Sequence, residues 1–225
     1  MTEKLYWLFG FVGLYWAYCL YWGIKGARSA KTSTDYFLAG GSIGVWVFVL
    51  AATATSFSGW TFVGHPGKIF TDGLPYAFAS FYALTIPLTG VLFLRRQWVL
   101  GKAYGYITPG EMYSDYYGGN SIRLLTVLVA FLFSVPYLGV QLRASGDLFN
   151  VLTDGLISVD VGMFALSTVV MIYVASGGLK SVAFVDCAQA ILLAVGIMIL
   201  GGVTLNYLGG WSSFTAGLAD LVRSD

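Results

Sequence analysis

The sequence predicts an all-α transmembrane protein. Of its 225 residues, 57% are hydrophobic and only 10% are charged, whereas soluble globular chains carry about 25% charged residues. The apolar residues gather into uncharged stretches of about 20 residues, the length of a helix that crosses a bilayer. The 12 Lys and Arg nearly balance the 11 Asp and Glu, so the chain lacks the basic field of a nucleic-acid-binding protein. We therefore expect a lipid bilayer as its surroundings and no nucleic-acid partner.

Six stretches are apolar enough over their length to be interpreted as transmembrane helices. Each is a continuous apolar block, unlike the strict alternation over about ten residues that transmembrane strands show. We expect one membrane domain over residues 1–225, with spans at about residues 5–24, 43–63, 74–94, 124–142, 161–179 and 187–211.

The first stretch is interpreted as a retained helix rather than a signal peptide, because no small-residue cleavage site follows it. The pairs Tyr6/Trp7 and Tyr21/Trp22 lie 15 residues apart, about 22 Å along a helix axis. This spacing suits aromatic anchors near the two headgroup regions.

Lys and Arg in the loops predict the orientation, because cytoplasmic loops carry an excess of both. With the N-terminus outside, eight cations lie inside and three outside, and Arg143 lies beside a helix end. The inside set is Lys25, Arg28, Lys31, Arg95, Arg96, Lys102, Arg123 and Lys180, and the outside set is Lys4, Lys68 and Arg223. We expect both termini outside the cell membrane, the inner membrane of a bacterium.

The second span is unusual in its middle, where residues 51–59 are nearly all small or hydroxylated. One interpretation is close helix packing through small residues, with each hydroxyl bonded to a carbonyl one turn earlier. The other is a discontinuous helix with a break at Gly59, whose freed carbonyls coordinate Na⁺ near the bilayer midplane. The turn residues 64–67 are expected to end this helix.

Prolines and charges mark the third and fourth spans. Pro87 and Pro136 each delete a backbone donor and predict kinks. The fourth span ends near Gln141 and Arg143, and we expect Arg143 to pair with Asp147 four positions later or to reach the interface.

The longest polar segment, residues 95–123, contains the start signal of a short surface helix. Thr108 is expected to cap it, Pro109 to take its first position and Glu111 to complete a capping box. The helix is expected around residues 112–117 and to end at Gly118.

Three segments together resemble the sodium:solute symporter family, whose members carry solutes such as sugars, proline, pantothenate and acetate. Residues 35–44 resemble the family's entry motif before the second helix. Residues 54–60, with the turn at 64–67 behind them, are similar to the broken second helix of the proline and pantothenate branches. Residues 173–181 and 185–189 resemble the signature between the fifth and sixth helices.

The resemblance implies one leader helix followed by the first five-helix inverted repeat of a LeuT-like fold. It also implies a sodium ion and a solute held at mid-membrane, with no covalent chemistry, no cofactor and no other metal. Carried onto this chain, it makes the carbonyls of Ala54 and Phe57 candidate sodium ligands. The candidate substrate-site residues are Ser56, Ser58, Gly59, Trp60 and Gln141. Ser56 stands where the proline-transporting branch has an Asp, so one negative charge near the cation is missing.

The resemblance leaves three functions open. The leading one is cation-coupled solute transport, in which this chain is an N-terminal fragment or a split gene product. Its missing C-terminal repeat would come from the same gene or a neighbouring one. The second is a symporter-like sensor domain of a histidine kinase, because residues 136–143 resemble the corresponding stretch of that branch. The third is a structural membrane subunit. The sequence names neither the solute nor the choice between Na⁺ and H⁺, and it predicts no enzyme.

Overall fold

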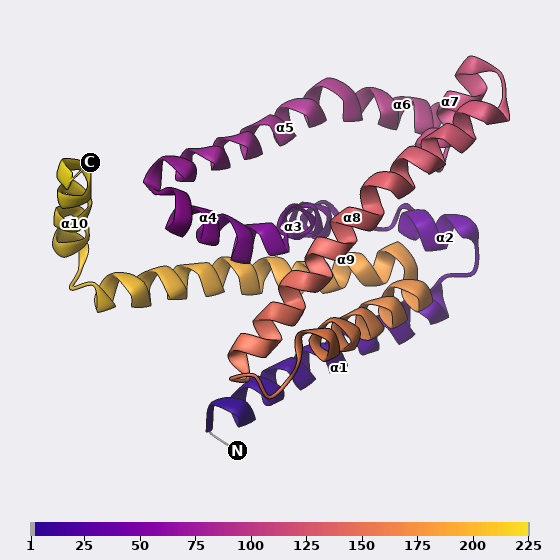
Figure 1. Cartoon of the computed structure of the whole chain (residues 1–225). Helices are drawn as coiled ribbons and strands as arrows, with labels where there is room; N and C mark the ends of the chain where they lie inside the picture. The colour runs from indigo at the N-terminus through magenta and orange to yellow at the C-terminus, as the bar shows by residue number, and fades with distance from the viewer. Residues whose placement is uncertain (1–2, 225) are drawn as a thin grey trace. The chain divides into compact units, whose positions relative to one another are not determined.

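The computed structural model describes residues 3–224, and this part of the chain is helical with no strand. Three of its helices are long and apolar enough to cross a membrane: α1 (Glu3–Ser29), α8 (Asn120–Leu152) and α9 (Val159–Tyr207). A fourth candidate exists if two shorter helical segments, Ser33–Gly41 and Val45–Ser56, are counted as one broken span. The described chain is thus an all-α membrane protein with three or four candidate spans (Figure 1).

The chain divides into two compact units. The first contains Met1–Ile43 and Phe57–Val182, and the second contains Gly44–Ser56 and Ala183–Asp225. The first unit is built from α1, the first part of α9 and the helices between them other than α3 (Val45–Ser56). The second unit contains α3, the rest of α9 and α10 (Trp211–Ser224).

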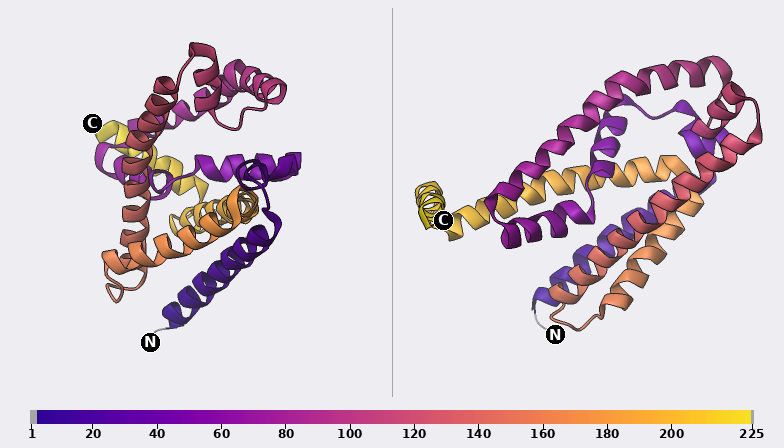
Figure 2. Two further views of the ribbon diagram at one scale, coloured as in Figure 1. Left: turned by 90° about the vertical axis from the view of Figure 1, so that its right-hand side faces the viewer. Right: turned by 45° about the horizontal axis from the view of Figure 1, so that its top comes forward.

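In the first unit α1, the C-terminal part of α8 and the beginning of α9 lie side by side (Figures 1 and 2). Glycines allow these helices to approach closely. A Cβ atom on Gly26 would lie 2.6 Å from the carbonyl oxygen of Gly177, and one on Gly146 would lie 2.5 Å from that of Val159. The buried Ser181 hydroxyl donates a 2.7 Å hydrogen bond to the carbonyl of Trp22. Small-residue packing therefore holds this bundle together.

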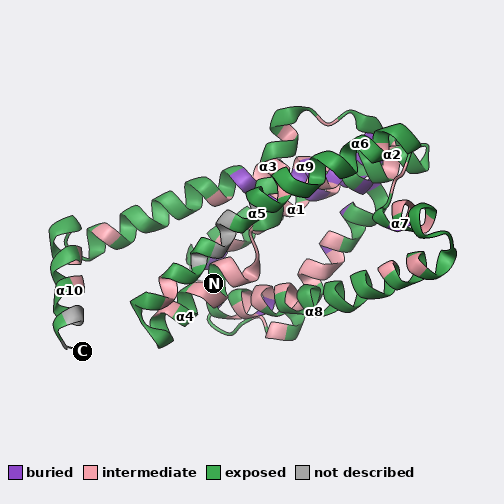
Figure 3. Ribbon diagram, turned by 90° about the horizontal axis from the view of Figure 1, so that it is seen from above, coloured by how far each residue is buried: buried purple, intermediate pink, exposed green. Residues whose placement is uncertain are grey.

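Most of the described residues are exposed, and few are buried (Figure 3). Large apolar side chains are exposed along α1, α8 and α9. A bilayer covers apolar side chains of this kind, so their exposure is consistent with helices that face lipid.

The expected span at residues 74–94 is divided into short segments. It consists of a 3₁₀ segment at Leu74–Leu84, α5 (Thr85–Thr89) and a π-helical turn at Gly90–Leu94. The helix then continues as α6 (Arg95–Tyr104). Pro87 lies within α5, where its ring removes a backbone donor and disturbs the regular pattern of α-helical bonds. Pro136, in contrast, lies inside the continuous helix α8.

The short surface helix is confirmed. It is α7 (Pro109–Tyr117), and the Thr108 hydroxyl accepts from the Glu111 amide while the Glu111 carboxylate accepts from the Thr108 amide. The Glu111 carboxylate also accepts a 2.7 Å hydrogen bond from the Ile107 amide. Gly118 ends the helix with φ +70°, a conformation that glycine adopts without steric cost.

A single helix, α9, covers both stretches that were expected as the last two spans. It joins two helical segments at Gly178, whose φ of +59° and ψ of −159° are not helical. At 49 residues it is about 74 Å long if straight, more than twice the thickness of a bilayer core. It ends at Tyr207, four residues before the expected end at Trp211, because Gly209 and Gly210 turn the chain with φ of +85° and +90°.

In the second unit the buried Ala54 and its neighbours on α3 are in the same compact body as the second part of α9. The Cys187 thiol approaches the carbonyl oxygen of Val47 at 3.5 Å. The Thr55 hydroxyl on α3 lies 3.3 Å from the Asp186 carboxylate on α9. This unit therefore carries the first half of the expected broken helix.

Candidate functional site

The expected break in the second apolar stretch is present, two residues earlier than predicted. Helix α3 ends at Ser56, and Phe57 and Ser58 are not helical. Gly59 was expected to be the hinge, but its φ of −56° and ψ of −30° are helical. The chain continues as a π-helical turn at Trp60–Gly64, an irregularity that is frequent at functional sites.

The turn expected at residues 64–67 was a wrong prediction. Gly64 is helical, and α4 (His65–Asp72) continues directly from the π-helical turn. Pro66 lies in the first turn of α4, where the missing amide N–H of a proline costs little because those donors lack intrahelical partners. The second helical piece is therefore longer than the sequence indicated.

Gly59 is attached to α8 within the first unit. Its amide N–H donates a hydrogen bond to the side-chain oxygen of Gln141. A Cβ atom on Gly59 would lie 2.6 Å from the Cβ of Ala144, so only glycine allows this close approach. The structure thus brings together two predicted site residues that are 82 positions apart in sequence.

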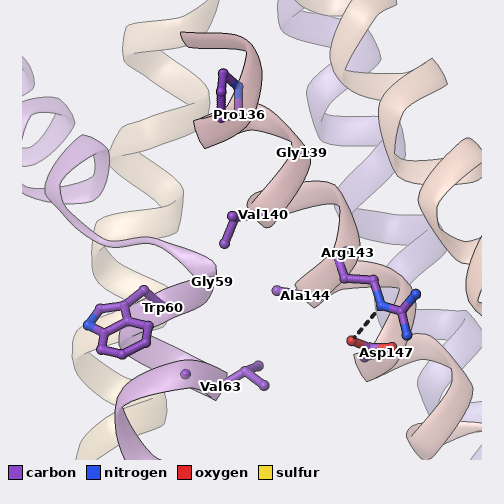
Figure 4. Close-up of a pocket in the computed structure, with 10 residues that line it drawn as sticks. Gly59, Trp60, Val63, Pro136, Gly139, Val140, Arg143, Ala144 and Asp147 are labelled. Atoms are coloured by element: carbon purple, nitrogen blue, oxygen red, sulfur yellow. Dashed lines mark hydrogen bonds and ion pairs between the residues drawn. The ribbon is translucent and has the colours of Figure 1, made fainter. Parts of the chain in front are cut away.

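An open pocket of about 420 Å³ lies beside this contact (Figure 4). One wall is the start of the second helical piece, with Gly59, Trp60 and Val63, and the other is α8 from Pro136 to Asp147. Arg143 and Asp147 form an ion pair of 3.1 Å along α8, drawn as a dashed line in Figure 4. The pairing expected for Arg143 is confirmed, and it neutralises both charges beside a mostly apolar pocket.

Several oxygen atoms lie at the end of α3, in the second unit. The last four carbonyls of a helix lack intrahelical donors, and Ala54 belongs to this set. The Thr55 hydroxyl lies 2.8 Å from the carbonyl of Ala51 and 3.3 Å from the Asp186 carboxylate. A carboxylate, a hydroxyl and helix C-terminal carbonyls are the oxygen donors that a hard cation prefers.

The other hydroxyls of this region are engaged locally. Ser56 donates to the carbonyl of Ala52 at 3.0 Å, and the Ser58 amide lies 3.4 Å from the Thr61 hydroxyl. Bonds from a hydroxyl to the preceding turn were the feature of the close-packing interpretation, and α3 shows them together with the break.

The predicted site residues therefore fall into two groups. Phe57, Ser58, Gly59, Trp60 and Gln141 belong to the first unit, and Ala54 and Ser56 belong to the second.

Asp186 was part of the signature motif, but sequence reasoning did not include it among the site residues. The available signal was an ionisable side chain next to a long apolar stretch, which in membrane proteins is a functional candidate by default.

The fold and the site define a class of protein: a helical, multi-pass protein of the cell membrane. One of its helices is broken and has oxygen atoms at the break that can coordinate a cation. Within that class, residues 36–222 match the sodium:solute symporter family, so the chain belongs to this family.

Three relatives show how far the similarity extends. The chain is 28% identical to the sodium/proline symporter of Escherichia coli strain K12, with 82% of this chain and 37% of the relative covered. It is 28% identical to the high-affinity proline transporter of Bacillus subtilis strain 168, with 81% and 39% covered. It is 24% identical to the sodium/proline symporter of Staphylococcus aureus strain JH9, with 90% and 40% covered. The chain thus spans about two fifths of their length, and no solved structure matches it significantly.

Proposed function

We propose that this chain forms part of a secondary transporter that couples the entry of a small solute to the flow of Na⁺. The observation that carries the proposal is the break at Phe57 and Ser58, between α3 and the helical piece that begins with Gly59. Breaks of this kind place unwound carbonyls and half-helix ends at ion and substrate sites in secondary transporters. Family membership supports the same function.

The coupling ion is assigned to the oxygen atoms at the end of α3 and at the break. The carbonyls of Ala54 and Phe57 are the proposed backbone ligands. Ser56 leaves this segment without a carboxylate, and Asp186 supplies one 3.3 Å from the neighbouring Thr55 hydroxyl. This negative charge supports a cation at the end of α3, and the dependence of uptake on Na⁺ and on pH distinguishes Na⁺ from H⁺.

The solute is assigned to the side of the break that faces α8. Gly59 and Trp60 line one wall of the pocket, and Ser58 directly precedes them. The Gln141 side chain on α8 accepts a hydrogen bond from the Gly59 amide, and Ser56 lies at the end of α3. The pocket of about 420 Å³ lies within the range of small-molecule sites. The named relatives act on proline, so we propose an amino acid of similar size as the first solute to test.

The proposed architecture is a leader helix and the first five-helix repeat of an inverted pair, crossing the inner membrane six times with the N-terminus outside. A second repeat, from the same gene or a neighbouring one, would complete the sodium site. The length of the relatives supports this arrangement, because the chain covers 37–40% of each. Alternating access then exposes the break to each side of the membrane in turn.

The test is uptake of radiolabelled L-proline into vesicles that contain the transporter completed by its second repeat. An inward Na⁺ gradient should drive uptake, and replacing Na⁺ by choline at constant pH should abolish it. Ser58→Leu should reduce uptake strongly because the side chain fills the break. The matched variant Thr204→Leu, at an exposed hydroxyl of α9, should leave it unchanged.

Uptake that follows a pH gradient and ignores Na⁺ would assign the coupling to protons. Absence of uptake under either gradient would contradict the proposal and favour the sensor or the structural subunit. A sensor would bind the solute at the same pocket without moving it across the membrane.

A further inference from the structure

Helix α10 is a short helix that directly follows the longest apolar helix of the chain. It covers Trp211–Ser224, 14 residues, and is therefore about 21 Å long. This is too short to cross the hydrocarbon core of a bilayer, which needs about 20 residues. Helices of this length next to a membrane are typical of segments that lie in the interface.

The two sides of α10 differ in polarity. Successive residues of a helix are 100° apart, which places Trp211, Phe214 and Leu218 on one face. Ser212, Ala216, Asp220 and Arg223 follow on the opposite face. The rings of Trp211 and Phe214 lie 5.6 Å apart, and Trp211 is 67% exposed. Phe214 and Leu218 are half-buried. The apolar face thus begins with an exposed tryptophan, a residue enriched at the boundary between lipid and water.

The exposed apolar surface of α9 extends to the end of that helix, directly before α10. Exposed side chains along the last turns of α9 include Ile199, Leu200 and Val203. The turn at Gly209 and Gly210 then redirects the chain, and α10 runs across the end of α9 within the same unit in each view (Figures 1 and 2). If α9 enters the bilayer, a helix that crosses its end lies along the bilayer surface.

We propose that α10 binds the surface of the lipid bilayer, with Trp211, Phe214 and Leu218 inserted at the boundary between headgroups and acyl chains. The occupant of this face is lipid because α10 directly follows a candidate membrane helix whose apolar side chains are exposed up to its end. The charges on the opposite face, Asp220 and Arg223, lie 4.0 Å apart and cancel. Apolar insertion therefore drives binding, and attraction to anionic headgroups contributes little.

The test places a nitroxide label at single cysteines in α10 of the chain reconstituted into lipid vesicles. Cys19→Ala and Cys187→Ala provide the background, because both native cysteines are free thiols. Phe214→Cys and Leu218→Cys report on the apolar face, and Ala216→Cys and Asp220→Cys form the matched pair on the polar face. Collisions with oxygen report exposure to lipid, and collisions with a water-soluble nickel chelate report exposure to water.

The expected result is an accessibility that changes with the helical period of 3.6 residues. Labels at 214 and 218 should gain oxygen collisions and lose nickel collisions relative to labels at 216 and 220. The pattern should be the same in vesicles of phosphatidylcholine alone and in vesicles that also contain phosphatidylglycerol. Equal nickel collisions on both faces would overturn the proposal, as would protection from both reagents at 214 and 218, which would mean that protein covers the face.

A second measurement uses α10 without substitutions. A photoactivatable phosphatidylcholine with its diazirine close to the headgroup should label peptides from residues 211–220 of the native chain. Lipid adducts on the end of α9 without adducts on α10 would overturn the proposal independently of any labelled variant.

Discussion

At the scale of single residues, the Gly59 amide shows how the site depends on both members of a distant pair. The break at Phe57 and Ser58 removes regular bonds from the backbone, and an unpaired amide inside a membrane costs several kcal/mol. Gln141 supplies the acceptor from α8, and the absence of a side chain on Gly59 allows α8 to approach. The two residues are therefore complementary, and changing either one leaves the other without its partner.

Asp186 carries the sharpest prediction at this scale. Asp186→Asn keeps the size of the side chain and its capacity to contact Thr55 but removes the charge near the end of α3. At a separation of about 10 Å and an effective dielectric constant of about 20, a unit charge contributes about 1.7 kcal/mol. The Na⁺ concentration that gives half-maximal uptake should therefore rise by about tenfold or more.

The measurement is the Na⁺ dependence of uptake at fixed solute concentration. Asp220→Asn, an exposed carboxylate on α10, is the matched control and should leave the half-maximal concentration unchanged. An unchanged Na⁺ dependence in Asp186→Asn would exclude a role for this carboxylate in holding the cation.

The sequence could predict these residues only in part. A stretch of small and hydroxylated residues left both close helix packing and a break open, and the resemblance favoured the break and made Gly59 and Trp60 candidate site residues together with Gln141. The sequence could not predict that the break lies at Phe57 and Ser58. Glycine tolerates non-helical dihedrals but does not require them, and contact with Ala144 explains why Gly59 is a glycine. The role of a glycine in packing depends on a partner that is distant in sequence.

At the scale of elements, the contact between α1 and α9 gives a structural role to the signature residues 177–181. They allow the two helices to pack closely, a role in packing rather than in chemistry. Gly177 and Gly178 are buried and face α1 or the segment after it. A Cβ on Gly178 would lie 2.5 Å from the carbonyl of Tyr36, and its φ is +59°. A side chain there would be strained for both reasons. The motif thus joins three segments of the first unit.

Gly26→Ala should weaken this helix contact. The added methyl group would meet Gly177 and the Ser181 hydroxyl, and overpacking of this kind costs about 1–3 kcal/mol. We expect a lower midpoint of thermal unfolding in detergent. Gly10→Ala is the matched control on the same helix, because nothing lies within 4 Å of its Cβ position. It should be neutral or stabilising through the better helix propensity of Ala, and equal losses in both variants would contradict the packing account.

The cap of α7 gives a prediction that depends on pH. Hydrogen bonds from the Ile107 and Thr108 amides, with a smaller contribution from Arg123, lower the pKa of Glu111. A carboxylate with a lowered pKa in the folded state stabilises it above the unfolded pKa of about 4.3. This stabilisation should be lost as the pH falls through the lowered pKa of Glu111. Amide hydrogen exchange in α7, compared between the native chain and Glu111→Gln at each pH, measures it.

The native chain and Glu111→Gln should differ in the protection of α7 amides from hydrogen exchange at neutral pH, and this difference should disappear in acid. Thr108→Ala removes the other half of the capping box and should cost about 1 kcal/mol at every pH. A difference between the native chain and Glu111→Gln that does not change with pH would contradict this assignment.

At the scale of the whole molecule, α9 decides how many times the chain crosses the bilayer. Composition predicted spans at residues 161–179 and 187–211, and hydropathy alone does not show whether the backbone between them is helical. The structure makes it helical on both sides of Gly178. A straight helix of about 74 Å cannot lie within a core of about 30 Å. The chain must therefore leave the core near Lys180, extend far beyond it, or bend at Gly178.

We expect two crossings, with the chain reversing near Gly178, because Lys180 is the cation that marks this loop as cytoplasmic. Single cysteines at Leu156, Lys180 and Leu208, on the background without Cys19 and Cys187, test this in oriented membrane vesicles. A membrane-impermeant maleimide should label positions 156 and 208 from the outside and position 180 from the inside. Labelling of 180 and 208 from the same side would contradict a second crossing. It would also remove the support that Lys180 gives to an outside N-terminus, since the eight-to-three distribution of cations depends on where that loop lies.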